Sequence, residues 1–192
     1  MCGRYVSEED QSIDLGALYR AVRVEYPQLP LASGEIFPTN TVPLLIGTTL
    51  TPAPATWGYQ GFEGKGIIIN ARAETAAQKP TFRGSVRGGR CVIPATGYFE
   101  WSQSGEKHLF SPAGSELLFM AGLFRMTPEG RRFVILTTAS TPVRQAAAIH
   151  PRMPLLLPAL SVGDWMRDIG FAARYLTCPA VGAVPLTCSR VG

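Results

Sequence analysis

Short apolar segments separated by Pro and Gly constrain the fold of this chain more than any other feature. The 192 residues include 16 Pro and 20 Gly, and most apolar runs between them are too short for helices. Runs of this length that are bounded by turn-forming residues are typical of β-strands. We therefore expect a strand-rich fold, with strands at residues 42–46, 67–69, 91–93, 98–101, 117–124, 132–138 and 186–188.

Helices are expected at only a few places. Residues 7–10 (SEED) have the pattern of a capping box, and an apolar stripe follows over residues 13–22 before Pro27. Residues 141–149 form a second expected helix with Pro in its first turn, and residues 161–169 form a third. Because these helices do not alternate with the strands, the pattern indicates an α+β fold with a mostly antiparallel sheet.

The chain shows no internal repeat and no linker long enough to divide it. We therefore expect a single domain over residues 1–192. The longest expected loop covers residues 51–66, which are rich in Pro and Gly and contain Trp57. No apolar run approaches the roughly 18 residues of a membrane span, and no signal peptide is visible, so we expect a soluble cytoplasmic protein.

Cysteine and histidine are too few and too scattered to organise the fold. The four Cys contain no CxxC pair, which excludes a disulfide scaffold, and two distant His give no metal-ligand spacing. We expect free thiols, no metal and no cofactor. We also find no P-loop, dinucleotide-binding or GxSxG motif.

The positive charge is concentrated in the middle of the chain. The formal net charge is +4, and Arg supplies 15 of the 18 basic residues. Residues 1–35 carry six acids against three Arg, whereas residues 65–100 carry six bases against two acids. This balance permits a polyanionic partner without requiring one, and a solvated loop is the alternative. Trp57 is interpreted as an exposed ring that could stack on bases.

Cys2 directly follows the initiator Met1, which is normally removed when the next side chain is small. Removal leaves an α-amine with a reference pKa of about 7.7–8.0 and a thiol of about 8.5 on adjacent carbons. This aminothiol forms a Schiff base with an aldehyde and closes to a thiazolidine. It also suits an N-terminal nucleophile that attacks acyl groups. Position alone leaves an incidental cysteine as the alternative.

Two further residues have surroundings that suit proton transfer. Glu100 lies among aromatic residues in the segment 97–101 (GYFEW), where partial burial would raise its pKa. His150 precedes the segment 151–154 (PRMP), in which two prolines fix the backbone as a site loop requires. A surface Glu and a packing His are the alternatives.

Four motifs occur in order along the chain: residues 1–5 (MCGRY), 70–75 (NARAET), 90–101 (RCVIPATGYFEW) and 150–154 (HPRMP). Together they resemble the SOS response-associated peptidase (SRAP) family, which processes abasic sites in DNA. The resemblance runs from Met1 to about Arg190. It implies a mostly antiparallel, barrel-like core with a few short flanking helices.

The resemblance also implies a covalent mechanism. Cys2 would capture the ring-opened aldehyde of an abasic site in single-stranded DNA as a thiazolidine, and the crosslink would shield the lesion during the DNA damage response. Asn70 matches the position that orients the cysteine, and Glu100 and His150 match the proton-transfer pair. Autoproteolysis of Met1 and an abasic-site lyase activity are implied as well. We expect a monomer that associates with DNA in the nucleoid.

Several positions match DNA-binding positions of the family. Arg4, Arg72 and Arg152 match residues that hold phosphates around the flipped-out sugar. Arg83 and Trp57 complete the expected DNA-binding set.

The chain also departs from the family pattern. Glu35 stands where the family usually has Asn, which places an acid near a phosphate path. Pro151 replaces the Asp that usually follows the histidine, and the loop after Trp57 is short.

Two other functions remain open on the sequence. The first is an N-terminal-nucleophile cysteine peptidase or hydrolase acting on other proteins, for which Cys2 would serve equally well. Such a peptide substrate does not need the arginines expected beside Cys2. The second is a non-catalytic DNA-binding module, whose salt-sensitive binding would be unchanged without the thiol.

Overall fold

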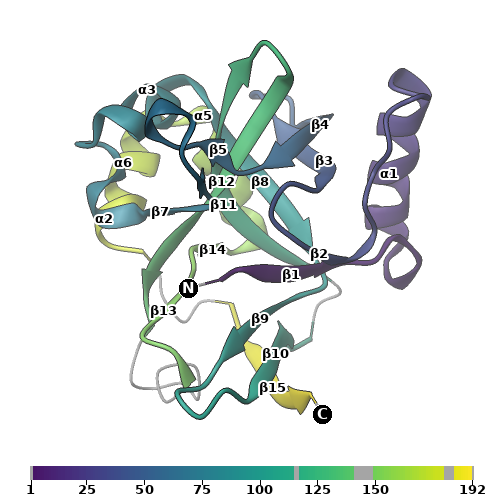
Figure 1. Cartoon of the computed structure of the whole chain (residues 1–192), viewed down its shortest axis with the longest axis vertical. Helices are drawn as coiled ribbons and strands as arrows, with labels where there is room; N and C mark the ends of the chain where they lie inside the picture. Colours follow the sequence, from purple (N-terminus) through teal and green to yellow (C-terminus); the bar gives the residue numbers. More distant parts are fainter. Residues whose placement is uncertain (1, 115–116, 141–148, 180–183, 192) are drawn as a thin grey trace.

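The computed structural model describes residues 2–114, 117–140, 149–179 and 184–191 (Figure 1). Five strands close into a small barrel in the order β12-β4-β3-β8-β11, and β11 pairs again with β12. These pairs are antiparallel except β4 with β12. The expected α+β fold with a mostly antiparallel, barrel-like core is therefore confirmed. The barrel strands are β3 (Thr41–Ile46), β4 (Thr51–Trp57), β8 (Arg90–Ala95), β11 (Leu118–Thr127) and β12 (Gly130–Ala139).

One apolar cluster fills the barrel and the space between it and a second sheet. Alternation along β8 divides its side chains, because Cys91 and Ile93 join this cluster while Val92 joins another beneath the helices. Gly122 on β11 borders the barrel interior, where a Cβ would lie 2.4 Å from Ile93 Cδ1. Only glycine fits at that close approach.

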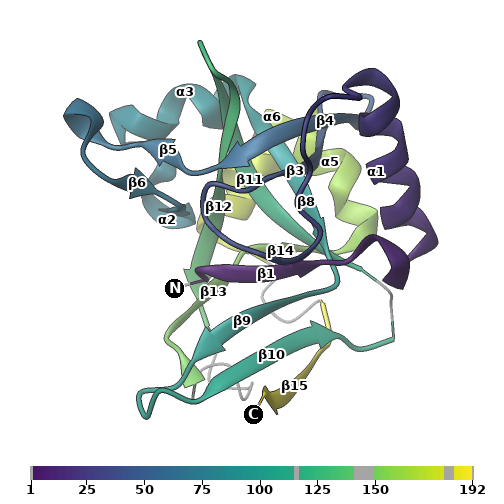
Figure 2. The same ribbon diagram turned by 45° about the vertical axis from the view of Figure 1, so that its right-hand side comes forward.

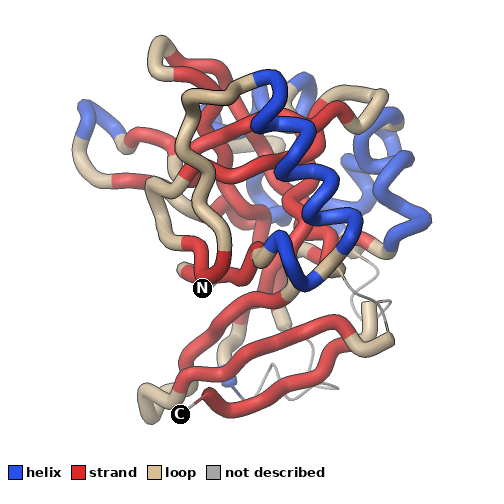
Figure 3. The backbone as a smooth tube through the Cα atoms, turned by 90° about the vertical axis from the view of Figure 1, so that its right-hand side faces the viewer, coloured by secondary structure: helices blue, strands red, loops and turns tan. Residues whose placement is uncertain are grey.

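Short helices cover the outside of the barrel. Figure 1 shows α1 on one side of the barrel and α2, α3 and α6 on the other, and Figure 3 views the molecule from the α1 side. The helices are α1 (Ile13–Glu25), α2 (Ala73–Ala76), α3 (Pro80–Gly88), α5 (Val162–Arg167) and α6 (Ile169–Thr177), with 3-10 turns η1 (Glu9–Gln11), η2 (Phe62–Gly64) and η3 (Ala159–Ser161).

The second sheet has five antiparallel strands in the order β15-β10-β9-β1-β2. Figure 2 shows β1 between the barrel and β9. We call the side whose residues pack into the barrel cluster the inner face, and it includes Tyr5, Tyr98 and Phe110. The opposite side is the outer face. The strands are β15 (Leu186–Val191), β10 (Lys107–Pro112), β9 (Gly97–Trp101), β1 (Arg4–Ser7) and β2 (Gly34–Ile36).

The remaining strands are short and flank the barrel. β5 pairs with β6, and both β7 and β13 pair with the second half of β12. β14 pairs with β11. Their bounds are β5 (Tyr59–Gln60), β6 (Ile67–Ile68), β7 (Asn70–Arg72), β13 (Arg152–Pro154) and β14 (Leu156–Leu157).

The expected loop at residues 51–66 is wrong in its first half, which forms β4. Pro54 lies directly opposite Pro43 of β3. Because neither has an N–H, the two meet at a point where an antiparallel ladder exchanges no hydrogen bonds, and Pro52 falls at the next such point. On its other side, β4 meets β12 only at residues 56–57, beyond both prolines. β4 therefore accommodates two prolines, although proline normally ends a strand.

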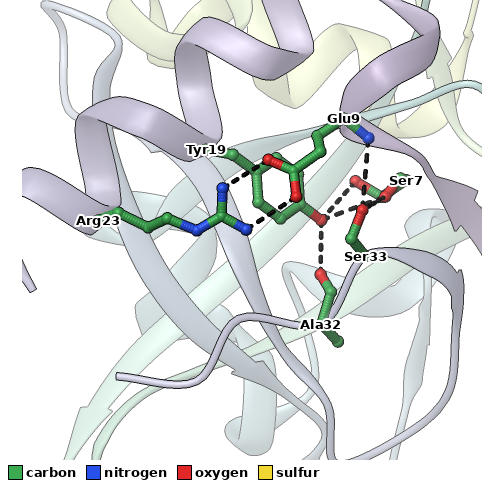
Figure 4. Close-up of polar contacts among 6 residues, drawn as sticks. All are labelled: Ser7, Glu9, Tyr19, Arg23, Ala32 and Ser33. Atoms are coloured by element: carbon green, nitrogen blue, oxygen red, sulfur yellow. Dashed lines mark hydrogen bonds and ion pairs between the residues drawn. The ribbon is translucent and has the colours of Figure 1, made fainter. Parts of the chain in front are cut away.

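The first helix begins later than the capping-box pattern predicts. Its N-cap is Ser12, whose hydroxyl accepts a hydrogen bond from the Leu15 N–H at 3.4 Å. Ser7 instead belongs to β1, where its hydroxyl lies 3.0 Å from the Tyr19 hydroxyl (Figure 4). The same Tyr19 hydroxyl donates to Ala32 O at 2.6 Å. This buried contact ties α1 to the edge of the second sheet.

Three other expectations have different outcomes. Residues 67–69 are not the buried strand expected, since Ile67 is 45% exposed and β6 pairs only with the two-residue β5. The helix expected at residues 141–149 lies almost wholly outside the described residues. The last strand, expected at residues 186–188, is confirmed as β15.

Candidate functional site

Cys2 lies at the junction of the barrel and the inner face of the second sheet. It is fully buried and belongs to the apolar cluster that the two share. Its Sγ lies 3.4 Å from Arg4 O, and its carbonyl oxygen accepts a hydrogen bond from Asn70 Nδ2 at 2.8 Å. These two residues are 68 positions apart in the sequence, so the fold brings together two of the predicted site residues.

Glu100 is on the inner face of β9 and is only 2% exposed. Burial raises the pKa of its carboxyl from 4.5 to about 7. A carboxyl that is about half protonated at neutral pH both donates and accepts protons, which is what general acid–base chemistry requires.

The Cys2 thiol is affected by the same surroundings. Burial raises the pKa of this thiol, and the negative charge of Glu100 raises it further. The thiol is therefore protonated at neutral pH, and its attack on an electrophile needs a base. Glu100 is near enough for its charge to be felt by the sulfur, and its own pKa suits it to that task.

His150 completes the group. Its Nδ1 lies 3.9 Å from Glu100 Oε2, and the same nitrogen lies 3.1 Å from the Arg152 N–H, which donates to it. Burial lowers the pKa of this imidazole, so the ring is neutral at neutral pH. The site thus combines a neutral base with a carboxyl that titrates near pH 7.

Strand β12 explains how residues so far apart in sequence come together. Its second half lies between β7, which begins with Asn70, and β13, which follows His150 by two residues. Ser140, just after β12, donates a hydrogen bond from its hydroxyl to His150 O at 2.7 Å. The structure therefore brings the four predicted catalytic residues to one place, while their catalytic roles remain predictions.

Arg4 is on the outer face of the same sheet, close to Cys2 in sequence but turned the other way. Its Nη1 lies 3.1 Å from Glu35 Oε1, and that oxygen also lies 2.9 Å from Lys107 Nζ. These two cations hold the pKa of Glu35 below its usual value, with the Lys107 hydrogen bond as the larger cause. Arg4 is thus an exposed cation that shares a carboxylate.

Arg152 is held by the protein itself. Its guanidinium binds Glu74 through two hydrogen bonds of 2.9 and 3.0 Å, and it also donates to Thr137 O. The paired carboxylate occupies the fork that a phosphate would use. Arg72 on β7, the third predicted phosphate ligand, is exposed, and so is Arg83 on α3, which was predicted as a further DNA-binding residue.

Trp57 is not the exposed stacking residue that the sequence interpretation expected. It is fully buried at the end of β4, and its indole N–H donates to Ile69 O at 2.9 Å. The ring packs edge-on to Tyr5 at 5.3 Å and stacks on Phe133 at 6.2 Å. Pro52 and Pro54 before it form part of a strand rather than a loop, so its ring fills the core and cannot reach a base.

Three residues of interest were missed at the sequence level. Lys107 shares Glu35 with Arg4, Glu74 holds Arg152, and Trp101 lies on the outer face beside both cations. Glu74 and Trp101 stand inside motifs that the sequence already displayed. Nothing in the sequence marks Lys107, because its partners become neighbours only through strand pairing.

Two absences hold for the described part of the chain. No group of three or more His, Cys, Asp or Glu side chains there is placed to hold a metal ion. None of the helices found there combines the length and apolar character that crossing a membrane requires.

Solved structures share this fold. A protein from Bacteroides thetaiotaomicron matches with a TM-score of 0.79 and 23% identity, over 100% of this chain and 92% of its own. One from Bordetella bronchiseptica matches with a TM-score of 0.75 and 23% identity, over 100% of both chains. The barrel with its second sheet places the chain in the structural class of these two proteins.

Sequence comparison identifies the family. The chain is 30% identical over 197 residues to the abasic site processing protein YedK of Escherichia coli (strain K12), covering 96% of this chain and 88% of YedK. It is 36% identical over 116 residues to the abasic site processing protein YoqW of Bacillus subtilis (strain 168), covering 57% of this chain and 52% of YoqW. The family profile of the SOS response associated peptidase (SRAP) matches residues 1–178, and the chain belongs to this family.

Proposed function

We propose that this chain processes abasic sites by covalent capture, with Cys2 as the nucleophile after Met1 has been removed. The observation that supports this most directly is a chain of contacts at Cys2: the Asn70 amide binds its carbonyl, the Glu100 charge acts on its thiol, and the His150 imidazole lies beside Glu100. Two sequence relatives are named abasic site processing proteins. The substrate we assign is the ring-opened aldehyde of an abasic deoxyribose in single-stranded DNA.

The reaction proceeds in two bond-forming steps. The free α-amine of Cys2 adds to the aldehyde carbon, and loss of one water gives a Schiff base. The thiol then adds across the C=N bond, so a C–S bond forms and the thiol proton is transferred to nitrogen. The product is a thiazolidine, and the overall change is condensation with loss of one water.

Asn70 is the residue we assign to orient the nucleophile. Its Nδ2 already holds the carbonyl of Cys2 at 2.8 Å. Its Oδ1 is buried and has no hydrogen-bond partner among the described residues. A buried acceptor of this kind is costly unless it is satisfied, and the α-amine freed by loss of Met1 is a donor of the right type.

Glu100 and His150 are assigned to proton transfer. The carboxylate form of Glu100 accepts the thiol proton as sulfur attacks, and its acid form donates when water leaves. His150 is within 3.9 Å of that carboxyl and remains neutral, so it serves as the second base for opening the sugar ring. Met1 removal by the same site, and strand cleavage by β-elimination from the Schiff base, are further steps that we assign to this group.

The direct test is the mass of the product. Purified protein is mixed with single-stranded DNA that carries one abasic site, and intact mass is measured under denaturing conditions. The expected species has the mass of the Met1-free protein plus the DNA, less one water. Cys2→Ala is expected to abolish it, because a Schiff base that no thiol can close to a thiazolidine is hydrolysed under the denaturing conditions.

Cys178→Ala and Cys188→Ala are matched controls, since each removes a free thiol that is less buried than that of Cys2. Both are expected to form the adduct at the wild-type rate. An adduct that persists in Cys2→Ala would overturn the proposal. Turnover of peptides in the absence of DNA, with no adduct, would favour the peptidase alternative instead.

A further inference from the structure

The outer face of the second sheet carries a cluster of cations and aromatic rings that the catalytic group does not use. Strand register places Arg4 opposite Phe99, and Lys107 opposite Trp101, all on the side away from the barrel. Glu35 reaches the same side from β2. We call Arg4, Lys107, Phe37, Phe99 and Trp101 the outer cation cluster, with Glu35 between its two cations.

One oxygen atom joins the two cations of this cluster. Glu35 Oε1 lies 3.1 Å from Arg4 Nη1 and 2.9 Å from Lys107 Nζ. The three side chains are between 24% and 38% exposed, so solvent reaches all of them. Ion pairs that solvent reaches in this way contribute less than buried ones, and a competing anion can therefore replace the carboxylate.

Aromatic rings surround the cations on their other sides. The Arg4 guanidinium lies 4.6 Å from the centre of the Phe37 ring and 5.3 Å from that of Trp101. The Lys107 ammonium lies 3.9 Å from the Phe99 ring centre and 5.9 Å from that of Trp101. These contacts hold both cations in position independently of Glu35. Phe37 is itself 40% exposed.

An oxygen shared by an arginine and a lysine is the arrangement in which proteins bind phosphate. Rings beside such a site add stacking surface for bases, the combination typical of single-stranded nucleic acid binding. We propose that the outer cation cluster binds a backbone phosphate of single-stranded DNA, and that Glu35 occupies the phosphate position until the strand displaces it. The choice of DNA as ligand rests on the function proposed above.

This inference makes Glu35 a residue that weakens binding. When residue 35 has no carboxylate, Arg4 and Lys107 can bind the phosphate without first losing a partner. Affinity for a single strand should therefore rise when Glu35 is replaced by an uncharged residue of the same shape. The salt dependence should become steeper, because more counterions are released on binding.

The test compares Glu35→Gln with Glu106→Gln. Glu106 is a matched control, because it pairs with one exposed arginine of this sheet, Arg190, at 2.7 Å, lies 4.0 Å from His108 Nε2, and is 37% exposed against 33% for Glu35. Both variants raise the net charge by one. Binding of an undamaged fluorescent single-stranded oligonucleotide is measured by anisotropy across a salt series, in a Cys2→Ala background so that no capture occurs.

Glu35→Gln is expected to bind about fivefold more tightly, the effect of about 1 kcal/mol for two exposed pairs. The slope of log affinity against log salt concentration should be steeper by about 0.7 for each cation released. Glu106→Gln is expected to stay within about twofold of the parent. Adding Lys107→Gln to Glu35→Gln should remove much of the gain. Because this double variant also restores the parent net charge, it tests the need for Lys107, while Glu106→Gln separates the released cations from net charge.

The outcomes separate this inference from the proposed function. Equal affinity of the two glutamine variants, with clear DNA binding in both, would overturn the role of Glu35 alone. Inorganic phosphate that competes as well as the oligonucleotide at matched ionic strength would replace the DNA assignment by a free-anion site. No measurable binding of single-stranded DNA by any variant would contradict both the inference and the proposed function.

Discussion

Two glutamates on opposite faces of the same sheet have pKa values displaced in opposite directions. Glu100, on the inner face, is 2% exposed, and burial raises the pKa of its carboxyl to about 7. Glu35, on the outer face, is partly exposed, and Lys107 and Arg4 hold the pKa of its carboxyl below the usual value. Both glutamates lie in the same sheet, so the difference between their pKa values comes from the side of the sheet that each side chain occupies.

The comparison shows what each face is suited to do. Burial makes Glu100 a group that exchanges protons near neutral pH, at a cost in stability. Pairing keeps Glu35 ionised, and its charge controls the cations around it. In our proposals, chemistry and binding are therefore separated by the thickness of one sheet, with β1 contributing Tyr5 to one face and Arg4 to the other.

The two tryptophans near this sheet should differ most in their effect on stability. Trp57→Ala removes a fully buried ring that packs on Tyr5 and Phe133, and we expect it to lower the free energy of unfolding by about 3–5 kcal/mol. Trp101→Ala, on the outer face, should cost less than about 1 kcal/mol and weaken binding of single-stranded DNA. Urea unfolding and anisotropy measure the two effects. Equal losses of stability would remove the contrast between the faces.

The pH dependence of stability should reveal the raised pKa of Glu100. Its folded pKa of about 7 exceeds the ordinary 4.5, so the folded protein binds more protons than the unfolded chain between these values. This contribution is complete below pH 4.5 and is lost as pH rises through 7. At about 1.36 kcal/mol per unit, the cost above pH 7 is about 3 kcal/mol.

Glu100→Gln should remove this loss. The difference in unfolding free energy between the variant and the wild type is expected to grow in favour of the variant from pH 5 to pH 8. Taking the difference cancels the ionisable groups that have no contact with residue 100, because their pKa values are the same in both proteins. Denaturant titrations at several pH values measure it, and a difference that does not change with pH would contradict the raised pKa.

Much of the fold could be predicted because its strands are continuous apolar runs. The runs that became β8, β11 and β12 stand out in the sequence, and the lack of alternation with helices predicted antiparallel pairing. The strand at Thr51–Trp57 could not be found this way, because prolines at alternate positions look like a loop until their opposing partners are known. Ser7 looked like a helix cap because its contact with Tyr19 is a tertiary one.

Some residues of the site could be predicted from the sequence and others could not, for a similar reason. Cys2, Asn70, Glu100 and His150 each stand in a local motif, and the resemblance to a family gave them a common place. The Glu35–Lys107 contact spans 72 positions and depends on the register of several strand pairs, so no local pattern shows it. Trp57 was misplaced because exposure depends on packing rather than on neighbouring Pro and Gly.

The most direct test of the proposed chemistry is the rate of covalent capture as a function of pH, measured for the wild type and for Glu100→Gln. Rates are followed by the appearance of the covalent adduct with abasic single-stranded DNA, at saturating DNA so that binding does not contribute. The wild-type rate should rise through an apparent pKa near 7, as the Glu100 carboxyl loses its proton and becomes able to accept one from the thiol.

In Glu100→Gln we expect the rise of the rate near pH 7 to disappear, and the rate at neutral pH to fall about 100-fold. Only the rise of the rate that follows deprotonation of the α-amine, whose reference pKa is about 8, should remain. Glu106→Gln serves as the control and should keep the wild-type profile. A Glu100→Gln profile that matches the wild type within about twofold would contradict the claim that the buried inner face of this sheet carries out the chemistry.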